Sequence, residues 1–240
     1  MPTAREALLD AARAALADLP WTAVRMVDVA AAAGVSRQTL YNEFGSKEGL
    51  ARALLRSEAD AYLEGVERIL GNPGTATNPG TGANTRTGTD PHTASHTDTG
   101  TDTEAGTGTD AGDRLASVAE WIVHEARTRP LLRALLTGCW GDRLPAPRPR
   151  PGPARRALTG SAAQRRADAG APGPAELVAA VLERSLAALG REGCGEETCE
   201  LAVRLALSCV VAPGPREEVG ALVRRAVGGV SARSPRAGAR

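Results

Sequence analysis

Apolar residues recur at helical spacing through most of the chain, and strand-like alternation over several residues is hard to find. Residues 4–19 place Ala or Leu every three or four positions with charged residues between them, which indicates an amphipathic helix that Pro20 ends. The same criterion predicts further helices over about 26–33, 37–43, 47–70, 114–129, 131–140, 175–189, 196–212 and 215–227. The pattern therefore predicts an all-α protein.

Three segments lack this pattern. Residues 71–113 are rich in Thr, Gly, Asp and Asn and contain no apolar side chain larger than Ala or Pro, so nothing in them offsets the entropy lost on ordering. We expect a disordered insertion there, and we expect no metal site at its two histidines, His92 and His96, because no rigidly held carboxylate or thiol cluster is near. Residues 145–174 predict a flexible basic linker, and 229–240 predict a disordered tail.

These interruptions divide the chain into parts. Residues 1–55 form a compact helical unit, and 56–70 form a connecting helix. After the insertion, residues 114–228 form a helical C-terminal domain with its own internal loop at 145–174.

The segment "MVDVAAAAGVSRQTLYNEF", residues 26–44, combines two short helices. Small apolar residues form one face of the first helix, Gly34 suits the tight turn, and Leu40 and Phe44 lie four apart on the second helix. Small residues let two helices cross closely at a steep angle, as in a helix-turn-helix. We therefore expect Phe44, the one phenylalanine of the chain, to be a core wedge.

With Leu40 and Phe44 turned inward, the second of these helices presents a polar outer face. Arg, Gln and Asn side chains can make paired hydrogen bonds to base edges in a major groove, and a Thr methyl can contact thymine. A tyrosine hydroxyl suits a backbone phosphate. The predicted base-reading residues are Arg37, Gln38, Thr39 and Asn42, with Tyr41 on the flank. The alternative is an ordinary solvated helix face.

Lys47 is the one lysine among 29 Lys and Arg residues. It begins the next helix, where free N–H groups favour an anion and a cation is locally unfavourable. That placement is easier to understand if a phosphate approaches. The sequence therefore predicts that Lys47 contacts the DNA backbone, and a plain surface lysine is the alternative.

The stretches "VDVAAAAGVS" and "TLYNEFGSKEGL" together resemble the N-terminal DNA-binding domain of TetR-family transcriptional regulators, over about residues 4–55. The residues that match the family pattern are Tyr41, Phe44, Ser46, Lys47, Glu48 and Leu50. The resemblance implies a cytoplasmic homodimer that places one recognition helix of each subunit in successive major grooves. It also implies a C-terminal domain that dimerises and usually binds a small effector.

Three positions depart from the family pattern, in two places. Asn42 and Glu43 stand where many members carry an aromatic residue and a histidine, so Glu43 either faces away from DNA or shapes specificity. Arg25 stands where the helix before the turn usually opens with Thr or Ser, so we expect this helix to lack its usual cap and Arg25 to contact phosphate. Both departures affect the expected operator sequence more than the resemblance to the family.

The C-terminal domain offers fewer signals. Its aromatic residues are Trp121 and Trp140, which we interpret first as core residues. Pockets combine apolar walls with a few polar groups, so a pocket here would be lined by Trp121, His124, Glu125, Cys139 and Trp140. Mostly aliphatic surroundings favour an apolar effector. The last two helices are apolar on more than one side, which dimerisation would bury.

Composition and the motifs that are missing limit which classes of protein remain possible. A net charge of +1 gives no global attraction to a polyanion. Four cysteines are too few for a disulfide framework and indicate free thiols in a reducing cytosol. An N-terminus without an apolar signal core and the lack of a long uncharged apolar run favour a cytoplasmic protein without a membrane segment. No nucleophile elbow, useful His pair or phosphate loop is present, so we expect neither an enzyme nor a cofactor.

The sequence thus favours a homodimeric repressor that a small-molecule effector releases from a palindromic double-stranded operator. Two alternatives remain: a constitutive DNA-binding dimer without an effector, and a DNA-binding unit fused to an enzymatic domain.

Overall fold

The computed structural model describes residues 3–71, 106–147, 171–190, 194–213 and 218–231 of the 240-residue chain. Within these ranges the structure is helical and contains no strand, which confirms the all-α prediction. None of the helices described is both long and apolar enough to cross a membrane.

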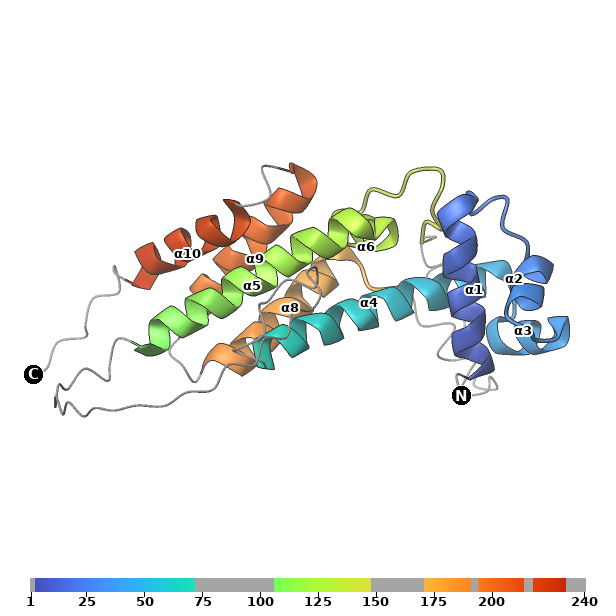
Figure 1. Cartoon of the computed structure of the whole chain (residues 1–240), viewed down its shortest axis with the longest axis horizontal. Helices are drawn as coiled ribbons and strands as arrows, with labels where there is room; N and C mark the ends of the chain where they lie inside the picture. Colours follow the sequence, from blue (N-terminus) through green and yellow to red (C-terminus); the bar gives the residue numbers. More distant parts are fainter. Residues whose placement is uncertain (1–2, 72–105, 148–170, 191–193, 214–217, 232–240) are drawn as a thin grey trace, which may run out of the picture.

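Three short helices pack together at one end of an elongated molecule (Figure 1). They are α1 (Ala4–Asp18), α2 (Met26–Ala32) and α3 (Arg37–Phe44), and α1 contacts both of the others as well as α4 (Lys47–Gly71). Thr3 begins α1 with a capping box, in which its side chain accepts from the Glu6 amide while the Glu6 carboxylate accepts from the Thr3 amide. Leu8, Leu40 and Leu54 are fully buried between these helices and belong to the apolar core that continues into the rest of the molecule.

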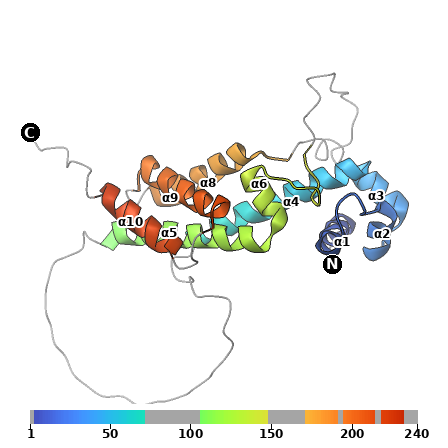
Figure 2. The same ribbon diagram turned by 90° about the horizontal axis from the view of Figure 1, so that it is seen from above.

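The 25-residue helix α4 belongs to both ends of the molecule. Its first half buries Leu50 and Leu54 against α1 and α3, and its second half buries Tyr62, Val66 and Leu70. Figure 2 shows α4 leaving the three short helices and continuing along α5 and α8. The predicted connecting helix over 56–70 is therefore the second half of one continuous helix.

The C-terminal helices surround α5 (Gly106–Thr128). They are α6 (Pro130–Thr137), α8 (Pro174–Leu189), α9 (Glu196–Val211) and α10 (Glu218–Ser231). Helix α5 contacts α4, α6, α9 and α10, and its Leu115 and Ile122 are almost fully buried. This group is the helical C-terminal domain that the sequence predicts.

Helices α4 and α5 meet closely at Gly65. The ring of Trp121 on α5 stacks on Tyr62 with the ring centres 5.7 Å apart, and a Cβ at Gly65 would lie 2.3 Å from the Trp121 ring. Burial raises the pKa of the Tyr62 hydroxyl above its ordinary value. Trp121 is thus a packing residue between the two helices, as the core interpretation expected.

The predicted insertion over 71–113 is too long at both ends. Helix α4 includes Gly71, and α5 begins at Gly106 rather than after residue 113. Ala111 is buried, and a Cβ at Gly112 would lie 3.6 Å from Val227 on α10. Small residues are therefore enough to pack this part of α5 against its neighbour, although they carry too little apolar area for the sequence criterion. His92 and His96 lie outside the described residues.

Other boundaries differ by smaller amounts. Helix α6 ends at Thr137, and Gly138 follows it with φ 71°, so Cys139 and Trp140 lie beyond the helix. Pro145 is buried although it begins the predicted linker, and α8 starts at Pro174, still inside it. Helix α10 begins at Glu218 and continues to Ser231, past the predicted domain end at 228. Residues 148–170 and 232–240 lie outside the described ranges.

Candidate nucleic-acid interface

The turn between α2 and α3 is built on Gly34. Its φ is 67°, in the left-handed region that glycine adopts without a steric penalty. The next amide, of Val35, donates to the Ala30 carbonyl at 3.1 Å. Ser36 then caps α3, because its Oγ accepts from the Thr39 amide at 3.0 Å. The predicted turn and cap are both present.

The inward face of α3 is held by Leu40 and Phe44, which are 0% and 2% exposed. The Arg5 guanidinium of α1 lies 4.8 Å from the centre of the Phe44 ring and forms an ion pair with Glu43 at 3.5 Å. Phe44 therefore wedges α3 onto α1, as predicted. Glu43, whose direction the sequence left open, faces α1.

A close backbone contact sets how α3 meets α4. A Cβ at Gly49 would lie 1.8 Å from the Phe44 carbonyl oxygen, so the two helices come this near only because residue 49 has no side chain. Ser46 accepts from the Gly49 amide at 3.1 Å, which caps the start of α4. Gly49 thus positions α3 relative to the long helix.

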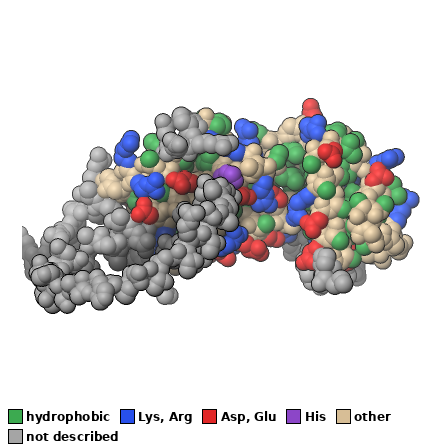
Figure 3. Space-filling view, in the orientation of Figure 1, with side chains coloured by type: hydrophobic (Ala, Val, Ile, Leu, Met, Phe, Trp, Pro, Cys, Tyr) green, Lys and Arg blue, Asp and Glu red, His purple; other side chains and the backbone are tan. Residues whose placement is uncertain are grey.

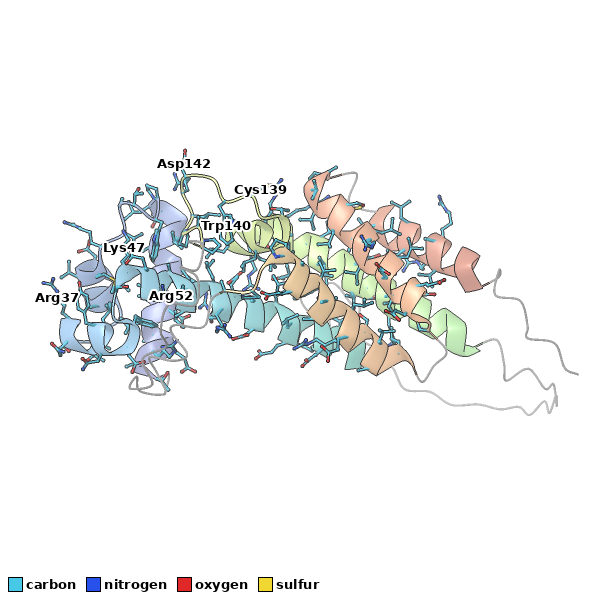
Figure 4. All side chains as sticks on the ribbon, turned by 180° about the vertical axis from the view of Figure 1, so that it is seen from behind. Arg37, Lys47, Arg52, Cys139, Trp140 and Asp142 are labelled. Carbon is cyan, nitrogen blue, oxygen red and sulfur yellow. The ribbon has the colours of Figure 1, made fainter. Side chains whose placement is uncertain are left out.

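The outer face of α3 carries the predicted polar set. Arg37, Gln38, Tyr41 and Asn42 are exposed, whereas Thr39 is half-buried with its hydroxyl 2.8 Å from that of Ser36. The Gln38 amide nitrogen donates to the Asn42 side-chain oxygen at 2.9 Å, and the Arg37 guanidinium lies 5.7 Å from the centre of the Tyr41 ring. Figure 4 shows Arg37 projecting from the end of the molecule that α1–α3 form.

These contacts restrain long side chains before any ligand arrives. The Gln38–Asn42 bond leaves one acceptor on Gln38 and donors on Asn42, so both keep groups that a base edge can meet. Ordering a long side chain costs about 0.5–1.5 kcal/mol on binding, and partial ordering beforehand lowers that cost. The face is consequently arranged for contact with a groove.

Lys47 lies beside the turn between α1 and α2. Its ammonium donates to the Thr22 carbonyl oxygen at 3.2 Å and lies 5.2 Å from the centre of the Trp21 ring. Arg25, the other predicted phosphate ligand, pairs with Asp28 at 2.9 Å, and α2 lacks a side-chain cap, as expected. Exposed pairs are worth roughly 0–1 kcal/mol, so a phosphate can take Arg25 from Asp28 at little cost.

Sequence reasoning missed Trp21 as a functional residue. Trp21 is 26 positions before Lys47 and only the fold brings them together. Its amide also donates to the Arg143 carbonyl at 2.8 Å, and the Arg143 guanidinium donates to the Asp18 carbonyl at 3.2 Å. The loop after α6 therefore reaches the DNA-binding end, and Figure 4 shows its labelled residues 139, 140 and 142 beside it.

A second junction between the two ends is buried. The carboxylate of Glu58 on α4 is 3% exposed and pairs with Arg129 at 2.8 Å and with Arg13 of α1 at 3.7 Å. Arg129 also pairs with Glu125 at 2.9 Å. Burial by itself would lower the pKa of Arg129. The hydrogen bonds and negative charges of Glu125 and Glu58 outweigh this effect and raise the pKa. One buried glutamate therefore joins α1 to the start of α6.

Charge is otherwise mixed along the molecule. Figure 3 shows basic and acidic side chains interspersed over the visible face, in agreement with a net charge of +1. Among the residues described, the visible face therefore carries no large patch of one charge sign.

The structure does not gather the five predicted effector residues around a cavity. Trp121 packs on Tyr62, Glu125 pairs with Arg129, and His124 and Cys139 are exposed. Trp140 is half-buried in the loop after α6. A separate apolar cleft between α5 and α9 leaves no room for a water molecule, and it is lined by Leu115, Val118, Ala119, Ile122, Ala202, Val203 and Ala206. The effector set stays a prediction.

Metal binding finds no support among the residues described, which contain no group of three or more His, Cys, Asp or Glu side chains suited to an ion.

The segment that carries this interface matches a family model. Residues 8–54 match the model described as "Bacterial regulatory proteins, tetR family". The chain is 47% identical over 66 residues to the HTH-type transcriptional regulator AlkX of Mycobacterium tuberculosis (strain ATCC 25618 / H37Rv), which covers 28% of this chain and 31% of that relative. The match thus spans about a third of the relative's length.

Two solved structures are similar to this chain over most of its length, at low sequence identity. The TetR family repressor AlkX from Dietzia sp. strain DQ12-45-1b is 18% identical with a TM-score of 0.46, covering 95% of each chain. A TetR transcriptional regulator from Rhodococcus sp. RHA1 is 18% identical with a TM-score of 0.42, covering 96% of this chain and 97% of that one.

Proposed function

Since the N-terminal domain, residues 8–54, belongs to the tetR family of bacterial regulatory proteins, we propose that the whole chain is a transcriptional regulator that reads an operator with α3. The observation that carries this proposal is the outer face of α3. It is polar, exposed and internally ordered, while Leu40 and Phe44 fix the opposite face in the core. Relatives in this family are regulators rather than enzymes, so we propose no reaction for the chain.

Base reading is assigned to Arg37, Gln38, Thr39 and Asn42. Arg37 can make a paired hydrogen bond to guanine, and Gln38 or Asn42 can do the same with adenine. Thr39 is the least accessible of the four and offers its methyl group to a thymine. These residues lie on two successive turns of one helix, so they can meet neighbouring base pairs.

Backbone contacts are assigned to Arg25, Tyr41 and Lys47. Such contacts set the register of the protein on the duplex and carry no sequence information. The Trp21 ring and the Thr22 carbonyl oxygen both contact the Lys47 ammonium. These two contacts hold the ammonium near the start of α4 and restrict the movement of the Lys47 side chain.

We further propose that the protein acts in the bacterial cytoplasm as a homodimer on a palindromic operator. Two recognition helices would lie about 34 Å apart, one turn of DNA. Half-exposed apolar side chains on α8 and α9 support this, because a second copy would bury them. They are Val178, Leu182, Leu186, Leu201 and Leu205.

Repression that a small apolar effector relieves is the proposed mode of control. An effector shifts the population of two conformations only by its differential affinity for them. Space for it would open by separating helices such as α5 and α9, whose cleft is aliphatic and closed. Glu58 and the loop at Arg143 are the contacts through which such a movement reaches α1–α3.

A fluorescence-anisotropy titration tests the proposal. The purified chain is titrated onto labelled DNA from upstream of its own gene and onto scrambled DNA of equal length across a salt series. We expect tight binding to the upstream DNA alone, with two subunits per site, and a weakened preference for that DNA in Arg37→Ala. Absence of binding to either DNA at low salt would refute the assignment of α3.

The same assay separates the alternatives. A regulator with an effector loses affinity when apolar ligands are added, whereas a constitutive DNA-binding dimer does not respond to any of them. Turnover of an added compound would revive the enzymatic alternative.

A further inference from the structure

Cys194 and Cys199 form a pair of thiols that the proposed function does not use. Their sulfur atoms are 3.4 Å apart, and both residues are buried. The other two cysteines differ: Cys139 is exposed and Cys209 is half-buried. Among the described residues, 194 and 199 are therefore the cysteines whose sulfurs lie within reach of each other.

The backbone holds this pair at the corner between two helices. The Cys194 amide donates to the carbonyl of Leu189, the last residue of α8, at 3.3 Å. The Cys199 amide donates to the carbonyl of Gly195, the N-cap of α9, at 3.2 Å. A backbone hydrogen bond thus fixes each cysteine. The two sulfur atoms need to move only a short distance toward each other to form a bond.

Accessibility differs between the two sulfurs. Cys194 is 8% exposed and Cys199 is 0% exposed. The contact with Cys194 and burial raise the pKa of the Cys199 thiol, so Cys199 stays a neutral thiol. Cys194 therefore keeps a small contact with solvent that Cys199 lacks.

From this geometry we propose that Cys194 and Cys199 are a modification site, a buried dithiol that a peroxide converts to an intramolecular disulfide. Cys194 attacks the peroxide through its sulfur, the O–O bond breaks, and sulfenic acid and water form. The Cys199 sulfur then attacks the Cys194 sulfur, the S–O bond breaks, and the second water leaves. In total, two thiols and one hydrogen peroxide give one disulfide and two waters.

The disulfide would tie Cys194, which lies between α8 and α9, to the first turn of α9. Helix α9 packs against α5, α6 and α10, so the cross-link restrains a helix at the centre of the C-terminal domain. The site is independent of DNA contact, and its test does not depend on the proposed operator binding.

Tryptic mass mapping tests the proposal directly. Cleavage after Arg191 and Arg204 gives a peptide of residues 192–204 that contains both cysteines of the pair, while Cys139 and Cys209 fall in other peptides. The native full-length chain is treated with hydrogen peroxide, unfolded, alkylated and digested. We expect this peptide to lose two hydrogen atoms and to take no alkyl group, and dithiothreitol to restore two alkylated thiols.

Matched variants identify the partners. Cys194→Ser should leave Cys199 alkylatable after peroxide and abolish the loss of hydrogen, with helical content by circular dichroism confirming its fold. The double variant Cys139→Ser/Cys209→Ser should form the disulfide as the native chain does, at a rate independent of protein concentration. The proposal is overturned if peptide 192–204 carries two alkyl groups when Cys139 is fully oxidised. It is also overturned if Cys194 ends as a sulfinic or sulfonic acid or is joined to a second chain.

Discussion

The ammonium group of Lys47 lies 5.2 Å from the centre of the Trp21 ring, and this contact joins the first residue of α4 to the turn after α1. A cation over an aromatic face is stabilised by about 0.5–1 kcal/mol at an exposed site. Trp21 is itself hydrogen-bonded to the loop after α6. The cation proposed to meet a phosphate therefore lies over the side chain of a residue whose backbone amide is bonded to the loop after α6.

Replacing Lys47 with Ala should weaken binding to all DNA sequences alike. Removing one phosphate contact should make the slope of log K against log salt shallower by about one unit. Anisotropy titrations on operator and scrambled DNA measure both slopes. Lys47→Arg keeps the charge and should keep most of the slope, whereas a loss confined to the operator would contradict a backbone role.

Replacing Arg37 with Ala should relax specificity at one base position. We expect a cost of about 1–3 kcal/mol on the operator and a much smaller cost on scrambled DNA, because a base contact is lost while backbone contacts remain. Competition titrations with single-base operator variants locate the position. Arg133→Ala, at an exposed arginine on α6, is the matched control and should bind like the parent.

A methyl group at Gly49 should disturb the junction of α3 and α4. The Cβ of Gly49→Ala would lie 1.8 Å from the Phe44 carbonyl oxygen, and backbone must move to make room, which typically costs about 1–3 kcal/mol of unfolding free energy. Urea unfolding measures this cost, and we expect operator affinity to fall as well. Gly71→Ala, on the same helix with nothing within 4 Å of the new atom, should not destabilise the protein.

Neutralising Glu58 should destabilise the junction between α1 and α6. Glu58→Gln removes the partner of Arg13 and Arg129 in a site where the carboxylate is 3% exposed. Losing charged hydrogen bonds there should lower the unfolding free energy by about 1–3 kcal/mol, measured by urea denaturation. Glu67→Gln breaks the more exposed pair with Arg184 and should change stability little; an equal effect of both would contradict the buried role.

Two changes to the segment predicted as an insertion should separate the part that adds stability from the part that does not. We expect replacement of residues 72–105 by a Gly/Ser linker of equal length to leave operator affinity and melting temperature unchanged. Removing residues 106–113 as well should lower the melting temperature, because it deletes the start of α5 and buried Ala111. Differential scanning fluorimetry compares the two, and identical melting would show that the first turns of α5 add no stability.

Local pattern predicts the recognition unit well because its signals are short-range. Leu40 and Phe44 are four residues apart, Gly34 needs its positive φ within its own turn, and Ser36 caps the helix that follows it. Each can be recognised from neighbours in the sequence, and each lies as expected.

Contacts between residues far apart in the sequence could not be predicted in this way. Nothing in the sequence pairs Lys47 with Trp21 or Glu58 with Arg129, since helical periodicity says which face is apolar and not which helix covers it. The predicted effector residues illustrate the same limit. Trp121 and Cys139 are both uncommon residue types in this chain, but their surroundings differ. Trp121 packs between two helices, whereas Cys139 is exposed to solvent.

Because α4 carries Leu54 and Val66 into one continuous apolar core, we expect the two ends not to melt as separate bodies. A fragment cut within α4 would expose apolar side chains at the break, so residues 1–55 alone would be a poor stand-in for the recognition unit. Heat denaturation should give a single calorimetric transition with equal van't Hoff and calorimetric enthalpies. Any compound that stabilises the C-terminal helices then also protects α1–α3 from proteolysis and thermal loss.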